Sequence, residues 1–566
     1  MGVEQLELVA VVGVLLIVAS SYFAGKFGVA TPIVLVLLGL GLSFLPGMPP
    51  IAPDPALILA GVLPPLLYSA AVNMPVVDFR RDLRTIGALS VVLVLVSAFG
   101  TGALLWWIFP DLGIAAAIAV GAVISPPDAV AATTIGKRLG LPPRLLTILE
   151  GEGLVNDATA LVLLRTAVAA TAGAFSFWQA AGDFAYAVVI AVVIGGFVGV
   201  LAVRVRSRID QPALTTAISF VVPFIAFLPA EALGASGVLA VVAAGLATGA
   251  GGVRRLSVQG RTAERLNWLT IQLLLENGVF LLMGLQLRTL VADVRSAGLS
   301  VTDSVWIGIA MVLALAVIRT VFVVPVVLAA RRRRSGHLEK ARRFEEILDQ
   351  VSQDDRLPQH PRRARIERWL QRHQADARFY AGNGLGLRGG AVIAWAGMRG
   401  VVTLAAVQSL PLDFPYRSQL VLLAFVVAVV TLVGQGGTLP LLIRVLGIRG
   451  TDEEQAQREL SLLLGELREA SAVQVLDNPD LRRRGGEPFD SAVLEKFRRL
   501  HSRTQEPQPA GVQEPLKAQL PELSQLLLEV QQDALNEARS IGAYDSHTIA
   551  RAQRMLDAGT ARRGTL

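Results

Sequence analysis

The sequence predicts an all-α polytopic membrane protein with about 13 transmembrane helices, followed by a C-terminal cytoplasmic helical tail. Two observations carry this prediction. The 566 residues are 53% hydrophobic, and the mean hydropathy of +0.54 exceeds that of ordinary soluble domains. The apolar residues also gather in segments of roughly 20, the length that a helix needs to cross the hydrocarbon core of a bilayer.

The expected spans follow one another from the N-terminus to residue 446. They lie at residues 6–24, 30–46, 56–74, 85–109, 112–136, 147–172, 183–203, 211–230, 234–250, 266–290, 303–330, 387–410 and 417–446. The first segment is interpreted as a span and not as a cleaved signal peptide, because residues 1–7 hold Glu4 and Glu7 but no Lys or Arg.

Basic residues in alternate loops predict the orientation of the chain. These loops carry Lys26; Arg80, Arg81 and Arg84; Lys137, Arg138 and Arg144; Arg204, Arg206 and Arg208; Arg254, Arg255, Arg261 and Arg265; and Arg331–Arg334. Because positive loops stay in the cytoplasm, we expect a multi-pass protein of the cell membrane with its N-terminus outside and its C-terminus inside. The net charge of +7 then reflects topology and contact with membrane lipid, not binding of nucleic acid.

The chain is expected to divide into a transmembrane domain, residues 1–446, and a cytoplasmic helical tail, residues 447–566. A basic cytoplasmic insertion at 331–386 carries the amphipathic patterns ARRFEEILDQV and ARIERWLQRH, which suit a membrane surface or a regulator. Whether it binds lipid, the tail or nothing is open. We interpret the tail as regulatory.

A long internal repeat is also predicted. If the spans divide as six, one connector and six, span five corresponds to span twelve, and the odd offset inverts the orientation. Span five contains ISPPDAV and span twelve contains WAGMRG. Both motifs are helix-breaking and charged, so we expect inverted six-helix repeats whose interrupted helices cross near the middle of the membrane.

The break in span five creates a candidate ion site. Pro127 removes a backbone donor and its ring clashes with the preceding turn, which should free carbonyls near Ala122 and Val123. Freed carbonyls beside Asp128 would suit a small monovalent cation. The alternative is that Asp128 only caps the half-helix that follows.

Asp157 lies inside the apolar segment TILEGEGLVNDATALVLLRTAVAA, where an ionised carboxylate costs several kcal/mol and usually serves ions or protons. Helical spacing places Glu152 on one face with Asn156, and Gly153 on one face with Asp157. The glycine should leave room for water or an ion. We expect Asp157 and Asp128 to bind a monovalent cation together; the alternative is that Asp157 pairs with an arginine of another span.

A supporting polar network is expected around these aspartates. Arg399 cannot shed its charge, so inside the membrane it needs a carboxylate partner. We expect Glu152 in that role, with Glu150 second, and interpret Arg399 as an electrostatic counterweight and not as an ion ligand. Arg165 should snorkel towards the interface, and Glu276 is interpreted as structural.

Neither cofactor nor enzyme chemistry is expected. The chain has no cysteine, and its five histidines lie in polar regions, which excludes Cys-ligated metal and a buried His metal site. Aspartates on consecutive spans would also suit an intramembrane aspartyl protease. Those enzymes need GxGD, whereas Leu-Val-Asn precedes Asp157.

Six motifs together resemble the monovalent cation:proton antiporter-1 family, the sodium/proton exchangers, and especially its bacterial NhaP-like members. They are LPPLLYSAAVN (63–73), GAVISPPDAVAA (121–132), ILEGEGLVNDATALV (148–162), SGVLAVVAAGL (236–246), FLLMGLQL (280–287) and WAGMRGVVTLA (395–405).

The resemblance implies a 13-helix fold with inverted repeats, a dimerisation domain and a moving six-helix core. It further implies a homodimer that exchanges cytosolic Na+ for H+. The family's Asn-Asp pair falls on Asn156 and Asp157, its span-five aspartate on Asp128, its core arginine on Arg399 and the glutamate of its glutamate-serine step on Glu152. Asparagine in the pair resembles the electroneutral branch, in which one carboxylate exchanges one proton for one ion.

Three departures from the family pattern bear on ion selectivity. Pro127 stands where many members have threonine, Gly153 replaces a serine, and Ser69 replaces a glutamate. The site thus lacks two side-chain oxygens and one charge, although Ser125 or water could substitute. Exchange of Na+ or Li+ for H+ is the main hypothesis; a K+/H+ antiporter on the same fold and a non-transporting membrane sensor are the alternatives.

Overall fold

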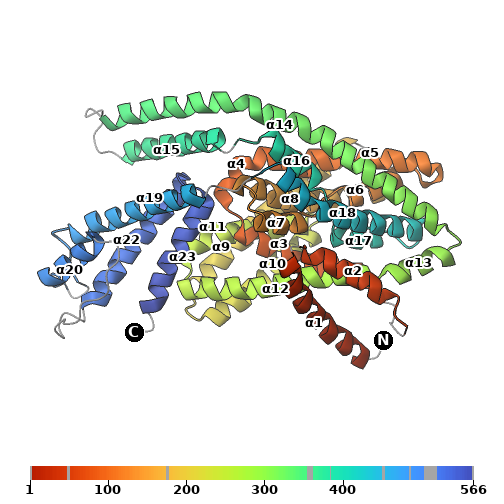
Figure 1. The fold of residues 1–566 in the computed structure, drawn as a ribbon, viewed down its shortest axis with the longest axis horizontal. Coiled ribbons are helices and arrows are strands. Elements are labelled where there is room, and N and C mark those ends of the chain that lie inside the picture. Colours follow the sequence, from red (N-terminus) through yellow and green to blue (C-terminus); the bar gives the residue numbers. More distant parts are fainter. Residues whose placement is uncertain are drawn as a thin grey trace. The chain divides into compact units, whose positions relative to one another are not determined.

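The computed structural model describes residues 3–27, 29–46, 51, 53–171, 173, 177–353, 361–382, 384–448, 453–483, 486–502 and 519–563. Regular structure in these ranges is helical (Figure 1). The chain forms two compact units, Met1–Arg332 with Leu385–Gly450, and Arg333–Gly384 with Thr451–Leu566.

Helices cover the centre of every apolar segment in the first unit. They are α1 (Val3–Phe27), α2 (Thr31–Ser43), η1 (Leu57–Val62), α3 (Leu63–Asn73), α4 (Val76–Gly87), η2 (Ala88–Val92), α5 (Leu93–Ile108), η3 (Pro110–Leu112), α6 (Ile114–Ile124), α7 (Ala129–Arg138), α8 (Pro143–Thr171), α9 (Phe177–Arg206), α10 (Pro212–Ala232), α11 (Gly237–Arg255), α12 (Val258–Leu285), α13 (Leu287–Ser296), α14 (Val301–Gln353), α16 (Leu387–Trp395), α17 (Val401–Gln408) and α18 (Arg417–Val445). Within the described residues, 8 helices are long and apolar enough to cross a membrane, and shorter apolar helices accompany them. The chain is therefore an all-helical, multi-span membrane protein, as predicted.

Two of these membrane segments are interrupted where the sequence predicts it. Between α6 and α7 the chain leaves the helix at Pro126 and Pro127, which cannot donate backbone hydrogen bonds. Between α16 and α17 it leaves the helix around Gly397 and Gly400. The backbone N–H of Asp128 donates to the carbonyl of Met398 at 2.6 Å, so the two breaks meet.

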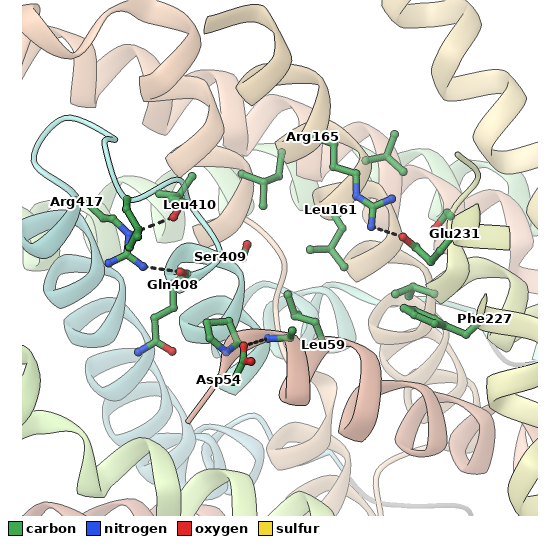
Figure 2. A pocket seen from close by; sticks show the side chains of 17 residues that line it. Asp54, Leu59, Leu161, Arg165, Phe227, Glu231, Gln408, Ser409, Leu410 and Arg417 are labelled. Atoms are coloured by element: carbon green, nitrogen blue, oxygen red, sulfur yellow. Dashed lines mark hydrogen bonds and ion pairs between the residues drawn. The ribbon is translucent and has the colours of Figure 1, made fainter. Parts of the chain in front are cut away.

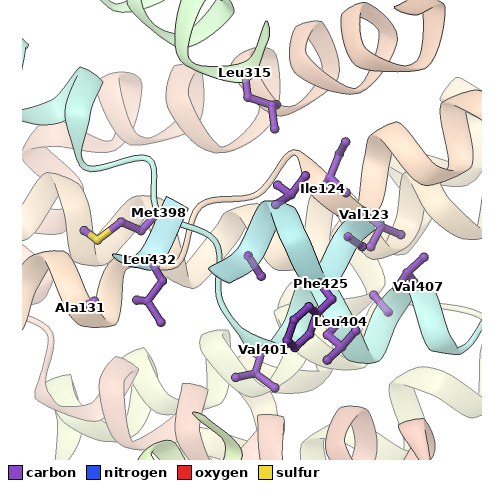
Figure 3. Packing of buried hydrophobic residues seen from close by; sticks show 14 of the residues in the cluster. Val123, Ile124, Ala131, Leu315, Met398, Val401, Leu404, Val407, Phe425 and Leu432 are labelled. Carbon is purple, nitrogen blue, oxygen red and sulfur yellow. The ribbon is translucent and has the colours of Figure 1, made fainter. Parts of the chain in front are cut away.

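Apolar side chains surround this meeting point. Figure 3 shows Val123 and Ile124 of α6 near Val401 and Leu404 of α17, with Phe425 of α18 among them. All are buried. The non-helical backbone at the two breaks is therefore surrounded by an apolar core. Each backbone N–H or C=O left without a hydrogen bond there would raise the free energy of the fold.

The second unit joins the basic insertion to the tail. Helix α15 (Pro361–Gly382) packs against α22 (Gln519–Ile541). Leucines of α19 (Glu453–Ser471) form a small core with α22 and α23 (Ser546–Arg563). A second small core involves η4 (Ala472–Leu476) and α20 (Ser491–Ser502). The amphipathic patterns of the insertion lie in the C-terminal part of α14 and in α15.

Close packing of α9 on α11 depends on small residues. A Cβ added at Gly195 would fall on the carbonyl oxygen of Ala240, and one at Gly199 would lie 2.5 Å from the carbonyl oxygen of Ala244. Nothing lies within 4 Å of a Cβ added at Gly196. One side of α9 is thus in backbone contact with its neighbour, as in other small-residue helix pairs in membranes.

We predict that Gly195→Ala destabilises the protein by about 1–3 kcal/mol, the usual effect of overpacking, because the methyl group forces α9 away from α11. Gly196→Ala is the matched control and should leave stability unchanged. Thermal unfolding midpoints of the purified variants in detergent check both expectations. Equal midpoints for the two variants would contradict the packing described.

Candidate ion site

Asp128 follows the break in span five and begins α7. Its carboxylate Oδ1 accepts a hydrogen bond from the backbone N–H of Val130 at 2.8 Å, so it caps the N-terminus of α7. The capping role considered from the sequence is therefore present. This cap uses only the Oδ1 atom of the carboxylate. No Lys or Arg among the described residues forms an ion pair with Asp128.

Gly400 allows the second break to approach this carboxylate. A Cβ added at Gly400 would overlap Oδ2 of Asp128 and would lie 2.8 Å from Asp128 Cβ. Because Gly400 has no side chain, the Asp128 carboxylate can lie against the backbone at the start of α17.

Asn156 connects α8 to the first break. Its side chain is buried, and its Nδ2 donates to the carbonyl oxygen of Pro127 at 2.7 Å. Its Oδ1 has no donor among the described residues. The amide thus satisfies one backbone oxygen of the break and retains an acceptor of its own.

Asp157 is the next residue on α8. With Val123, Pro126, Leu161 and Val402 it lines a small cavity of about 10 Å³, roughly what a single water molecule occupies. Among the described residues, no hydrogen-bond donor and no cationic side chain contacts its carboxylate. Its charge therefore lacks a fixed protein partner.

The space expected beside Asp157 at Gly153 is not open. A Cβ added at Gly153 would lie 2.7 Å from the Cβ of Ala129 on α7. The prediction that this glycine leaves room for an ion is wrong, because the start of α7 packs into the position. The glycine instead allows α7 and α8 to approach each other.

Glu152 is paired, but with Arg319 of α14. Arg319 donates from Nη1 and Nη2 to the two carboxylate oxygens at 2.6 and 2.8 Å, and its Nε donates to the carbonyl of Ile393 at 3.0 Å. Both side chains are about 2% exposed. The expected pairing of Glu152 with Arg399 is therefore wrong, since the bidentate geometry commits both oxygens of Glu152 to α14.

The guanidinium of Arg399 donates its hydrogen bonds to backbone carbonyls and not to a carboxylate. Its Nε donates to the carbonyl of Ile124 at 3.0 Å and its Nη2 to that of Ser125 at 3.2 Å. Its Nη1 donates to the carbonyl of Gly397. The guanidinium thus sits at the C-terminus of α6, where unpaired carbonyls carry partial negative charge.

The break leaves the carbonyls of residues 124, 125 and 127 to side-chain donors, Arg399 for the first two and Asn156 for the third. The hydroxyl of Ser125 donates to the carbonyl of Gly121 at 2.6 Å, so its hydrogen is used within α6. Glu150 pairs with Lys137 at 2.6 Å, and both are partly exposed, which places it at the periphery of the network.

A larger cavity of about 540 Å³ is lined by Leu161 and Arg165 of α8, which follow Asp157 in that helix (Figure 2). Leu161 lines this cavity as well as the small one at Asp157. Arg165 does not simply snorkel, since its Nη2 contacts Glu231 of α10 at 2.6 Å. Arg417 borders the cavity from α18 and donates to the carbonyls of Gln408 and Leu410.

Sequence reasoning missed Leu161, Glu231 and Arg417 as cavity residues and gave no role to Arg319. The signal for Arg319 existed, because an arginine within an apolar segment requires a partner. No comparable signal marks Leu161, which is one of many leucines in its helix.

The family described as "Sodium/hydrogen exchanger, transmembrane" matches residues 12–445. The chain belongs to the sodium/hydrogen exchanger family. The resemblance inferred from the six motifs is confirmed, and the protein is a monovalent cation/proton antiporter of the membrane and not an enzyme.

Individual relatives agree. An uncharacterized Na(+)/H(+) exchanger of Mycobacterium tuberculosis is 30% identical over 438 residues, covering 76% of this chain and 72% of the relative. A "sodium, potassium, lithium and rubidium/H(+) antiporter" of Bacillus pumilus is 30% identical over 295 residues, 49% of this chain and 43% of the relative. The sodium proton antiporter MjNhaP1 of Methanocaldococcus jannaschii shares the fold, with a TM-score of 0.55 at 14% identity over 79% of this chain and 98% of that one.

We predict that Arg319→Leu lowers stability by about 3–5 kcal/mol, because it leaves the Glu152 carboxylate buried without a partner. The double variant Glu152→Leu/Arg319→Leu should recover much of that loss, since both charges are removed together. Thermal unfolding of the two variants checks this. A double variant as unstable as the single one would contradict a pairwise role.

Gly400→Ala is expected to reduce exchange strongly, because the added methyl group displaces the Asp128 carboxylate. The matched control is Gly434→Ala in α18, where nothing lies within 4 Å of an added Cβ. Exchange rates of folded protein in proteoliposomes distinguish the two. Normal exchange by Gly400→Ala would show that the close approach at Asp128 is dispensable.

Proposed function

We propose that the chain is a secondary active antiporter that exchanges Na+ or Li+ for H+ by alternating access at a shared carboxylate site. One observation carries the proposal. Asp128 and Asp157 lie where two interrupted helices cross, and neither forms an ion pair among the described residues, whereas Glu152 beside them does. A membrane carboxylate without a protein cation is suited to bind a transported cation or a proton.

In the proposed mechanism, Asp157 holds either the proton or the cation, and Asp128 contributes a second carboxylate. Asn156 holds the broken backbone in place through Pro127 and offers its free Oδ1 to the cation. Arg399 and the Glu152–Arg319 pair keep the surrounding charges balanced. Since one carboxylate alternates between one proton and one monovalent ion, exchange is 1:1 and electroneutral.

The same geometry also supports K+ as a substrate. Pro127 and Gly153 supply no side-chain oxygen, so the site imposes few fixed ligands on the ion. The Bacillus pumilus relative is named for sodium, potassium, lithium and rubidium. A K+/H+ antiporter is therefore the second candidate function.

The architecture that we propose around this site has 13 spans arranged as inverted six-helix repeats, with α6–α7 and α16–α17 as corresponding interrupted spans. The basic loops support an N-terminus outside and a C-terminus in the cytoplasm. A homodimer is proposed from the family resemblance. The unit that joins α15 to the tail is proposed to be regulatory, because it links an insertion between two membrane spans to the C-terminus.

We expect Asp157→Asn to abolish exchange while the protein stays folded, because the amide cannot alternate between proton and cation. The measurement is collapse of a preset pH gradient in proteoliposomes by Na+, Li+ or K+, with the membrane voltage clamped and unclamped. Asp111→Asn, on the exposed turn η3, is the control for the same chemical change and should behave as wild type.

Each result of this measurement bears on a separate part of the proposal. Voltage dependence would contradict electroneutral exchange. Collapse of the pH gradient by K+ but not by Na+ would support K+/H+ antiport in place of Na+/H+ antiport. Exchange retained by Asp157→Asn would overturn the shared carboxylate site.

A further inference from the structure

Helix α15 of the basic insertion has one buried side. Leu370, Ala377 and Ala381 on this side are 3%, 5% and 7% exposed, and the helix packs against α22 of the tail. Glu345 on α14 accepts from Nη2 of Arg378 at 2.7 Å, so α15 is in contact with two helices of its unit. These contacts determine which side chains of α15 face outwards.

The outward side of α15 combines basic and apolar side chains. Ile366 is 49% exposed and Trp369 is 52% exposed. Arg365 and Arg368 are exposed as well, and Arg372 is partly exposed. Since an α-helix has 3.6 residues per turn, these five side chains share less than half of its circumference, with the three arginines next to the two apolar residues.

Acidic side chains do not cancel this positive charge. Between residues 365 and 382, α15 has two acidic residues, Glu367 and Asp376. The helical geometry places Glu367 on the side opposite the arginines. Asp376 belongs to the outward side and is partly buried. The outward side is therefore net positive, and its charge and its apolar residues together fit an anionic surface with an apolar layer beneath it.

The chain keeps the end of α15 close to the membrane. Helix α14 contains the apolar segment Val301–Arg332, which is long enough to cross a bilayer, and α16 begins the next proposed span at Leu387. Helix α15 ends at Gly382, five residues earlier. An extended chain covers at most about 3.6 Å per residue, so the end of α15 stays within roughly 18 Å of the start of α16. Lipid headgroups are therefore within its reach.

We propose that the outward side of α15 binds the anionic lipid headgroups of the membrane surface. Arg365, Arg368 and Arg372 pair with lipid phosphates, and Ile366 and Trp369 enter the boundary between headgroups and acyl chains. Basic residues are attracted to anionic lipid, and tryptophan favours this boundary because its ring is apolar with one polar end. The sequence left open whether the insertion binds lipid, the tail or nothing; in this proposal one side of α15 contacts the tail and the other binds lipid.

The test follows the distance of α15 from lipid in the full-length protein. The chain has no cysteine, so Ile366→Cys can be labelled with a fluorophore at that position only and reconstituted in nanodiscs with nitroxide-labelled headgroups. We expect strong quenching in phosphatidylcholine mixed with phosphatidylglycerol, and much less in phosphatidylcholine alone. Leu462→Cys is the matched control, because Leu462 is 63% exposed on α19, which carries more acidic than basic residues. Its label should stay unquenched in both mixtures.

The contribution of charge is tested by Arg365→Gln/Arg368→Gln in the labelled Ile366→Cys protein. Each arginine close to an anionic surface strengthens binding roughly fivefold, so the ratio of bound to unbound α15, read from the quenching, should fall about 25-fold. Arg551→Gln/Arg554→Gln on α23 removes two exposed arginines with the same spacing and should leave the quenching unchanged. Choline chloride at about 1 M shortens the screening length to about 3 Å and should weaken the quenching of the otherwise unaltered protein.

Equal quenching in the two lipid mixtures, or unchanged quenching in Arg365→Gln/Arg368→Gln, would overturn the role of anionic lipid. Absence of quenching in both mixtures would show that protein or water covers the outward side, and equal quenching at Leu462→Cys would show that the whole unit lies near lipid without a specific site; either result would overturn the proposal. Were Ile366→Cys to fold poorly, a label at Arg372→Cys on the same side carries the same expectations.

This inference goes beyond the proposed antiport and rests only on the proposed spans that flank the insertion. The quenching is measured without an ion gradient. A failure of the lipid proposal therefore leaves the exchange of Na+ or K+ for H+ untouched, and a failure of exchange in proteoliposomes leaves the quenching result valid.

Discussion

The structure depends on one constraint: two helices are broken inside an apolar environment, and every backbone group that the breaks release needs a partner. The N–H of Asp128 is satisfied by the carbonyl of Met398. Arg399 donates hydrogen bonds to the carbonyls at the end of α6, and Asn156 donates one to the carbonyl of Pro127. Much of the polar side-chain chemistry at the crossing thus first stabilises the fold, and only the oxygens left over are free for an ion.

The pairing of charges separates structural from functional carboxylates. Glu152, with both oxygens bound by Arg319, cannot give them to a cation without leaving a buried arginine unpaired, which is strongly unfavourable. Asp128, Asp157 and Glu276 have no such partner in the described part of the chain. Their charges are therefore those that a proton or a transported cation can neutralise.

The sequence predicts the breaks well because their causes are local. Two prolines in ISPPDAV end α6, and the glycines of WAGMRG open the chain between α16 and α17, whatever surrounds them. The partners of the long side chains are not local. Arg319 and Arg399 both lie in apolar segments, and only the crossing of α14 with α8 decides that Arg319 reaches Glu152. The space beside Gly153 could not be predicted from the sequence of α8 either, because it is filled by Ala129 at the start of α7.

Helix α8 links the two sides of the site mechanically. It carries Glu150, Asp157, Leu161 and Arg165 without interruption, so its rise of roughly 1.5 Å per residue fixes their order across the membrane. Leu161 separates Asp157 from the large cavity, while Arg165 joins the same helix to α10 through Glu231. A displacement of α8 along its axis would therefore alter access at both ends in the same step. That coupling is what exchange requires, since an ion site open to both sides at once would leak.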